Sequence, residues 1–185
     1  EKLFEGKQPI AHGGISELDP MFSPAARQYG YDAAAARKLL DEAGFSTLRN
    51  NVRHNAAGEK LSIELGTTAG NRVRELVAQV IQSQLRQVGI EVRLKAEPPR
   101  IFFDAMGKRT YSGLGMYAWV QRPGGVPRSS LHSKEIPSAA NGWSGQNYPG
   151  YANPEMDKAL DAAERELDAV NRRTRRNGKP KVCHL

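Results

Sequence analysis

The sequence has 185 residues, a length that suits one ordinary domain with room for a sizeable core. Hydrophobic residues make up 39% of it and charged residues 25%, which is typical of a soluble globular protein and argues against wholesale disorder. The single cysteine, Cys183, excludes a disulfide framework within the chain and a zinc finger built on cysteines.

The formal net charge of +7 comes mostly from the end of the chain. Residues 171–185 hold six basic side chains and no acid, whereas residues 1–170 hold 21 basic and 20 acidic ones. The body therefore lacks the uniform positive excess of a nucleic-acid-binding domain. We predict that residues 171–185 form a disordered, solvated tail. The alternative is a nucleic-acid-associated module that uses this basic tail.

The first third of the chain predicts one helix between irregular segments. Residues 1–30 are rich in glycine and proline and show no sustained period, so we expect an irregular lead-in. Asp32 is a good N-cap, residues 33–43 are mostly strong helix formers, and Gly44 suits the position after a helix. Residues 46–60 are polar and contain turn signals, which predicts a surface hairpin or loop.

The middle of the chain predicts a βαβ unit. Residues 61–65 alternate apolar and polar, as a half-buried strand does, and residues 90–94 alternate again. Between them, residues 73–88 place apolar side chains on one helical face, with Asn71 as N-cap and Gly89 at the end. Short connections between strand, helix and strand predict parallel strands with a right-handed crossover.

The last third predicts a short helix, a third strand, a long loop and a final helix. The helix and strand fall at residues 101–106 and 114–119. Residues 120–152 are punctuated by glycine and proline, and a loop this long in a compact domain is usually functional or disordered. Asn153 and Pro154 then suit the N-cap and first position of a helix. Its apolar stripe comprises Met156, Ala159, Leu160, Ala163 and Leu167.

Residues that carry enzyme chemistry are not grouped in this sequence. The four histidines stand singly, and Cys183 with its neighbour His184 gives two ligands where a closed zinc site needs four. There is no glycine-rich phosphate loop, and Ser144 lacks the frame of a nucleophile elbow. We therefore predict no catalytic residues, no cofactor, no metal site and no enzymatic activity. A small α/β enzyme remains an alternative that would need a converging acid, base or nucleophile.

Aromatic and polar residues gather at and after the third predicted strand. In α/β folds, ligands tend to lie in the crevice at the carboxyl ends of strands. Trp and Tyr offer rigid contact area there, while Arg, Gln and Asn can bind carboxylate and peptide groups. The competing interpretation is that the two tryptophans only cap the core. The candidate ligand-binding residues are Tyr117, Trp119, Gln121, Arg122, Arg128, Trp143 and Asn147.

Several motifs follow one another in a characteristic order. Residues 31–45 read YDAAAARKLLDEAGF, residues 78–92 read AQVIQSQLRQVGIEV, and residues 148–157 read YPGYANPEMD. These segments, with the strand at residues 61–67 and the LFEG of residues 3–6, resemble the extracytoplasmic substrate-binding proteins of ABC transporters. The most similar group is family 5, which binds peptides, nickel and some sugars.

The resemblance implies a fold and a function. It implies an α/β chain that is one lobe of a periplasmic-binding-protein-like fold, with a βαβ unit, a mixed sheet and packing helices. Residues 1–170 match only the C-terminal lobe, so we expect a fragment without its N-terminal lobe. The implied function is capture of a peptide or similar small solute outside the cytoplasm, in the periplasm or at a lipid anchor. The implied partners are that solute, the missing lobe and ABC transporter permease subunits, with no nucleic acid.

One departure from the family pattern bears on the solute. Peptide-binding members often carry W-x-x-D-Y-x-x-P after the third strand, and its Asp holds the amino terminus of the ligand. Here Trp119 stands where that Asp would fall, and no acid lies between Thr110 and Lys134. The resemblance therefore implies no counter-charge for a peptide amine from this segment. Arg122 and Arg128 can instead meet a carboxylate or another anion.

Overall fold

The computed structural model describes residues 4–5, 7, 13–19, 22–24, 29–120, 122 and 124–166. The chain divides into two compact units, which are considered separately. The first, called the sheet unit, holds Gly30–Met106 and Thr110–Ala118. The second, called the loop unit, holds Glu1–Tyr29, Gly107–Arg109 and Trp119–Leu185. The predicted basic tail lies outside the described residues.

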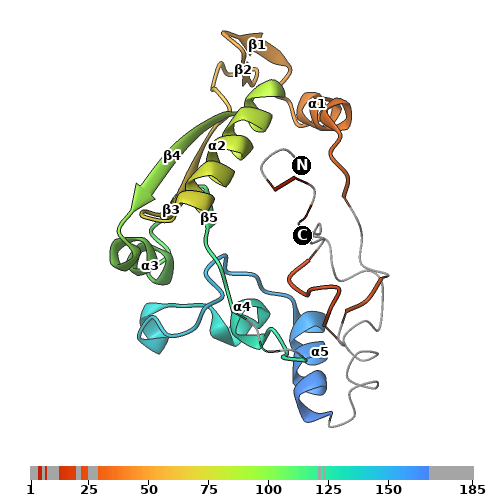
Figure 1. Ribbon diagram of the computed structural model, residues 1–185, viewed down its shortest axis with the longest axis vertical. Helices are drawn as coiled ribbons and strands as arrows, with labels where there is room; N and C mark the ends of the chain where they lie inside the picture. The colour runs from red at the N-terminus through yellow and green to blue at the C-terminus, as the bar shows by residue number, and fades with distance from the viewer. Residues whose placement is uncertain are drawn as a thin grey trace. The chain divides into compact units, whose positions relative to one another are not determined.

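The elements of both units are labelled in Figure 1. The chain passes from residue 30 to residue 118 through α1 (Ala33–Glu42), β1 (Thr47–Arg49), β2 (Val52–His54), β3 (Ser62–Thr68), α2 (Arg72–Gln87), β4 (Glu91–Glu97), α3 (Pro99–Gly107) and β5 (Leu114–Met116). The loop unit contains α4 (Arg128–Leu131), the 3-10 helices η1 (Ser133–Glu135) and η2 (Ala139–Asn141), and α5 (Pro154–Arg165). None of the helices in this described part of the chain is long and apolar enough to cross a bilayer.

Helix caps set the helix starts where the sequence predicts them. The Oδ1 atom of Asp32 accepts hydrogen bonds from two backbone N–H groups in the first turn of α1, at 3.0 and 2.8 Å. Asn71 accepts one from Arg74 at 3.0 Å, and Asn153 caps α5 in the same way. Gly44, just after α1, adopts φ +89°, which a side chain would strain. These predictions are confirmed.

The sheet unit contains the predicted βαβ unit. β3 and β4 pair in parallel along their whole length, and β5 pairs in parallel with the other edge of β3. The third strand is shorter than expected, because pairing ends at Met116. Among the described residues this sheet is parallel throughout, and antiparallel pairing occurs in the β1–β2 hairpin and at the His54–Lys60 bridge. The mixed sheet that we expected is thus a parallel sheet with a separate antiparallel hairpin.

The core of the sheet unit lies between α2 and one face of the sheet. Because side chains alternate along a strand, Leu65 and Val92 point to the same face, where they meet Ala78 of α2. All three are buried, and Ile81 and Leu85 pack against them. The apolar face of α2 and the apolar face of the strands therefore pack together as one layer. Figure 1 shows α2 lying along the sheet.

On the opposite face of the sheet, two glycines leave space for α3. Gly66 and Gly115 are register partners on β3 and β5. A Cβ atom on Gly66 would lie 3.5 Å from the ring of Phe102, and one on Gly115 would lie 2.8 Å from the Cε of Met106. Both α3 side chains are buried. The two glycines thus leave room for the apolar face of α3.

Replacing Gly115 with alanine should destabilise the sheet unit by about 1 kcal/mol, at the low end for overpacking, because the end of Met106 can move aside. Amide hydrogen exchange at Leu65 and Val92 measures this. Gly107→Ala is the matched control, since nothing lies within 4 Å of its Cβ position. Equal effects of the two substitutions would show that crowding by α3 is not the cause.

Candidate functional site

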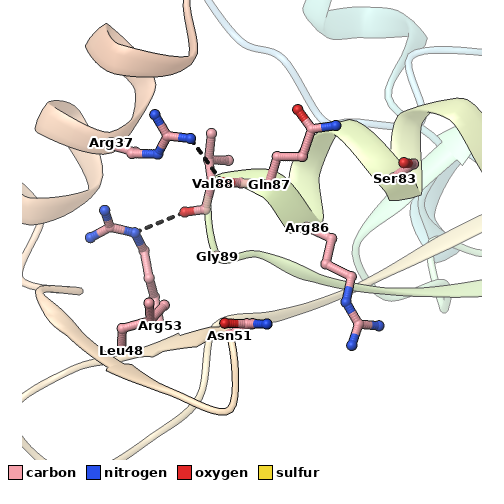
Figure 2. A pocket seen from close by; sticks show the side chains of 9 residues that line it. All are labelled: Arg37, Leu48, Asn51, Arg53, Ser83, Arg86, Gln87, Val88 and Gly89. Atoms are coloured by element: carbon pink, nitrogen blue, oxygen red, sulfur yellow. Dashed lines mark hydrogen bonds between the residues drawn. The ribbon is translucent and has the colours of Figure 1, made fainter.

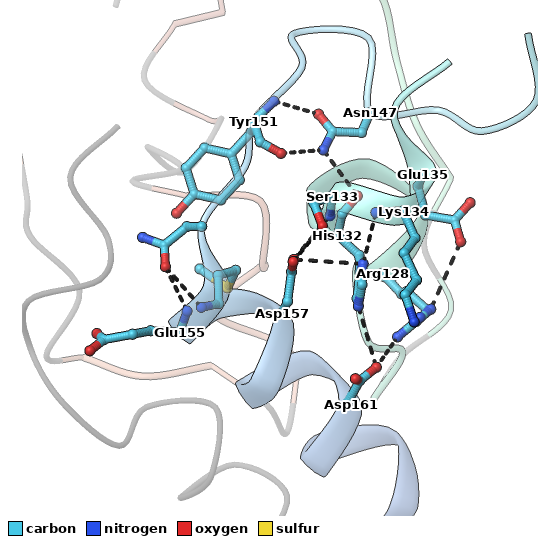
Figure 3. Close-up of polar contacts among 12 residues, drawn as sticks. Arg128, His132, Ser133, Lys134, Glu135, Asn147, Tyr151, Glu155, Asp157 and Asp161 are labelled. Carbon is cyan, nitrogen blue, oxygen red and sulfur yellow. Dashed lines mark hydrogen bonds and ion pairs between the residues drawn. The ribbon is translucent and has the colours of Figure 1, made fainter. Parts of the chain in front are cut away.

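The long loop of residues 120–152 is anchored by a buried amide. Asn147 has no exposed surface. Its Nδ2 donates to the carbonyl oxygens of His132 and Tyr151 at 3.1 and 2.7 Å, and its Oδ1 accepts from the N–H of Tyr151 at 2.9 Å (Figure 3). One side chain therefore joins two stretches of loop that are far apart in sequence. Its polar atoms are already committed to backbone groups.

The loop is also fastened to α5 through two acids one turn apart. Asp157 accepts hydrogen bonds from the N–H of Ser133, at 2.9 Å, and from its hydroxyl. Burial acts to raise the pKa of Asp157, but the bonds from Ser133 and the nearby His132 outweigh it, so the pKa lies below its usual value. The ionised form of this carboxylate is therefore favoured.

The second acid, Asp161, binds a predicted site residue. Arg128 Nη1 lies 2.5 Å from Asp161 and 3.2 Å from Glu164, and its Nε lies 3.8 Å from Glu135 (Figure 3). The hydrogen bond to Arg128 lowers the pKa of Asp161, and the same bond raises the pKa of Arg128. Three carboxylates surround this guanidinium, so its charge is balanced within the loop unit.

His132 completes this polar network. The ring is 2% exposed, and its Nδ1 accepts a hydrogen bond from the N–H of Lys134 at 3.0 Å. Its Nε2 is buried and lies 3.4 Å from Asp161 Oδ1, but it makes no hydrogen bond with the described residues. In the sequence His132 is one of four scattered histidines, and its spacing gives no sign of these partners.

Two tryptophans of the loop unit remain open to solvent. Trp119 and Trp143 are each 44% exposed. The indole of Trp119 stacks on the buried ring of Tyr148, with centroids 6.4 Å apart and planes 24° from parallel. Trp143 has φ +62°, and its backbone N–H donates to Ser138 at 2.8 Å. Both side chains offer an apolar surface that the unit itself does not fully cover.

The other predicted site residues lie in different parts of the chain. Tyr117 belongs to the sheet unit, where its ring packs edge-on against Phe102 and Phe103 at 5.9 and 5.6 Å. Arg122 is exposed in the loop unit, and its side chain makes no ion pair with the described residues. Gln121 lies outside the described residues. In the part of the chain that the structure covers, no group of three or more histidine, cysteine or acidic side chains is arranged to hold a metal ion.

The fold and motif order match known solute-binding proteins. An oligopeptide-binding protein from Thermus thermophilus, solved with a pentapeptide, superposes with a TM-score of 0.83 at 30% identity, over 93% of this chain and 31% of that one. The oligopeptide-binding protein AppA of Bacillus subtilis is 30% identical over 147 residues, which are 74% of this chain and 24% of AppA. The nickel-binding periplasmic protein of Escherichia coli is 24% identical over 74% of this chain.

These similarities define a class of protein and then a family. The fold is α/β and periplasmic-binding-protein-like, as the motifs imply. The bacterial extracellular solute-binding proteins, family 5 Middle, match residues 1–141, and the chain belongs to this family. It spans about a quarter to a third of the length of the relatives it matches. The relatives from Bacillus subtilis and Thermus thermophilus are named as oligopeptide-binding proteins, and the family is described as extracellular.

Proposed function

We propose that this chain forms the C-terminal lobe of an ABC transporter's solute-binding protein. The complete protein captures a peptide or similar small solute outside the cytoplasm, in the periplasm or at a lipid anchor, and delivers it to membrane permease subunits. Closure of two lobes around the solute is the mechanism, with no chemical step. The observation that carries this proposal is the family match over residues 1–141.

The exposed aromatic side chains are the part of the site that we assign to solute contact. Trp119 is supported from behind by Tyr148, so its exposed face is held in a fixed orientation at little entropic cost. Trp143 offers a second exposed ring from the same unit. Arg128 and Asn147, in contrast, already have partners, and we propose that they act on the solute by holding the loop in shape.

Arg122 is the residue of this unit that we propose for charge recognition. The balanced guanidinium of Arg128 has little charge to offer an anion, whereas Arg122 is exposed and makes no ion pair with the described residues. A guanidinium suits a carboxylate, such as the terminal carboxylate of a peptide, through two parallel hydrogen bonds. A solute with an acidic group therefore fits this face better than a cationic one.

Replacing Trp119 with alanine in the complete gene product should weaken solute binding about tenfold or more, because a central aromatic contact is lost. Native mass spectrometry with a library of short peptides identifies a ligand, and calorimetry with that ligand measures the loss. The melting temperature should change little. Val120→Ala, at a neighbouring side chain that is 98% exposed, is the control and should bind normally. A parallel loss of thermal stability and affinity would make Trp119 a core residue instead.

A further inference from the structure

Arg109 has a backbone conformation that favours glycine. It follows the end of α3 with φ +54°, in the left-handed region. The N–H of Thr110 donates to the carbonyl of Ala105 at 3.0 Å, a bond that closes the helix end and puts Arg109 at the position where glycine is usual. An arginine there bears a backbone cost that glycine would avoid. A residue held in this way is a candidate for a role of its side chain.

The side chain of Arg109 contacts the backbone of the loop unit, to which Arg109 itself belongs. Its Nε donates to the carbonyl oxygen of Tyr148 at 3.1 Å. Its guanidinium lies against Gly150, where a Cβ atom would be 2.9 Å from the Cζ of Arg109. A side chain at position 150 would therefore displace the guanidinium, so the two residues are matched to each other.

The backbone that Arg109 binds is a tight turn. The N–H of Gly150 donates to the carbonyl of Asn147 at 3.1 Å, so residues 147–150 form a β-turn with Tyr148 at its second position. The N–H of Asn147 in turn donates to the carbonyl of Glu135 at 3.0 Å. The bond that closes such a turn does not use the carbonyl of the second residue, and here Arg109 binds it. The backbone is thus fixed on both sides of the Tyr148 side chain.

The ring of Tyr148 supports Trp119. Tyr148 is 9% exposed, and the indole of Trp119 stacks on it with centroids 6.4 Å apart. The energy of such a pair depends on how the two rings are oriented. A shift of the Tyr148 backbone would therefore change the direction of the exposed face of Trp119. Arg109 is connected to that face through one hydrogen bond and one pair of stacked rings, all within the loop unit.

We propose that Arg109 is a positioning residue, which holds the turn of Tyr148 so that Trp119 presents its exposed face to the solute. This inference rests on the proposed function, because that function assigns Trp119 to solute contact. The alternative is that Arg109 only ends α3. The two roles differ in what they predict for glycine at position 109, since glycine suits the left-handed conformation but has no side chain.

Arg109→Gly separates the two roles in the full chain carrying Trp143→Phe, where Trp119 is the one tryptophan. The amide of Thr110 should exchange with solvent no faster than in the parent, because the helix end keeps its closing bond. Quenching of Trp119 fluorescence by acrylamide should nevertheless increase, because the ring beneath the indole is no longer held. If Arg109 only ends α3, both measurements should stay as they are in the parent.

Affinity is measured in the complete gene product with the peptide that the library identifies for the Trp119 experiment. Arg109→Gly should weaken binding about tenfold, since a hydrogen bond from a charged donor is lost. It should add no further loss to Trp119→Ala, because Arg109 acts through Trp119. Asn51→Gly is the matched control. It introduces glycine at φ +60° in the turn between β1 and β2 of the sheet unit (Figure 2), and it should change neither quenching nor affinity.

Four results would overturn the positioning role. They are unchanged quenching in R109G, unchanged affinity in R109G while W119A loses affinity, a further tenfold loss when R109G is added to W119A, and equal effects of N51G. Normal binding by W119A would instead contradict the assignment of Trp119 to solute contact, and the inference would fall with it. The quenching result does not depend on the solute, so the two failures are distinguishable.

Discussion

Replacing Asn147 with alanine is expected to destabilise the loop unit by roughly 3 kcal/mol. The substitution removes an amide that is entirely buried and leaves three backbone groups of His132 and Tyr151 without their partner. Each buried polar group left unpaired costs about 1–3 kcal/mol, and partial relaxation keeps the total near the lower bound. The loop between α4 and α5 should lose its shape before α5 itself unfolds.

Urea denaturation followed by tryptophan fluorescence measures the stability of the loop unit itself. The two tryptophans of the chain, Trp119 and Trp143, both belong to that unit. Asn141→Ala is the matched control. That amide also makes two hydrogen bonds, to the N–H of Ser138 and the carbonyl of Ile136, but it is exposed and water can replace them. Its loss should be about 1 kcal/mol or less. Equal losses in the two variants would contradict an anchoring role for Asn147.

Local signals explain how much of the fold could be predicted. The N-caps Asp32, Asn71 and Asn153 act on N–H groups two or three residues away, so residue type and spacing are enough to locate them. The parallel pairing of β3 and β4 follows from a helix between two alternating strands, and it too is confirmed. In both cases the interacting residues are close in sequence or share a regular period.

The contacts of the candidate site could not be predicted as well from the sequence, because they join residues that are far apart along the chain. Arg128 meets Asp161 33 residues later, and Asn147 meets His132 15 residues earlier. Composition alone marks Arg128 and Asn147 as polar loop residues fit to bind a ligand. Only the fold shows that Arg128 and Asn147 have protein partners, whereas the exposure of Trp119 is compatible with the solute contact that the sequence predicts.

The same reasoning applies to the pocket in the sheet unit that Arg37, Arg53 and Arg86 line (Figure 2). Its members come from a helix, a hairpin strand and the end of another helix, and in the sequence Arg86 is one polar position on the outer face of an amphipathic helix. A solvated surface charge is the ordinary interpretation of such a residue. The pocket becomes visible only when the β1–β2 hairpin folds back beside the end of α2.

Acid should loosen the attachment of the loop to α5, and Asp157 should account for much of the effect. Burial and Asp161 act to raise its pKa, but hydrogen bonds from Ser133 and the nearby His132 hold it below its ordinary value. A carboxyl with a lowered pKa in the folded state binds its proton more readily once unfolded. Its contribution is therefore complete above the unfolded pKa of about 4 and is lost as the pH falls through the lower folded value.

Asp157→Asn should therefore lower the stability of the loop unit by about 2 kcal/mol near neutral pH, because two charge-assisted hydrogen bonds from Ser133 become neutral ones. This gap, the difference in unfolding free energy between the variant and the parent chain, should shrink steadily below about pH 5. Urea titrations at several pH values, read by tryptophan fluorescence, measure that gap. Glu155→Gln removes the same charge from the first turn of the same helix, where the acid has no side-chain partner among the described residues. A gap for D157N that does not change with pH, or a pH dependence equal to that of E155Q, would mean that the contacts of Asp157 with Ser133 do not hold the loop on α5.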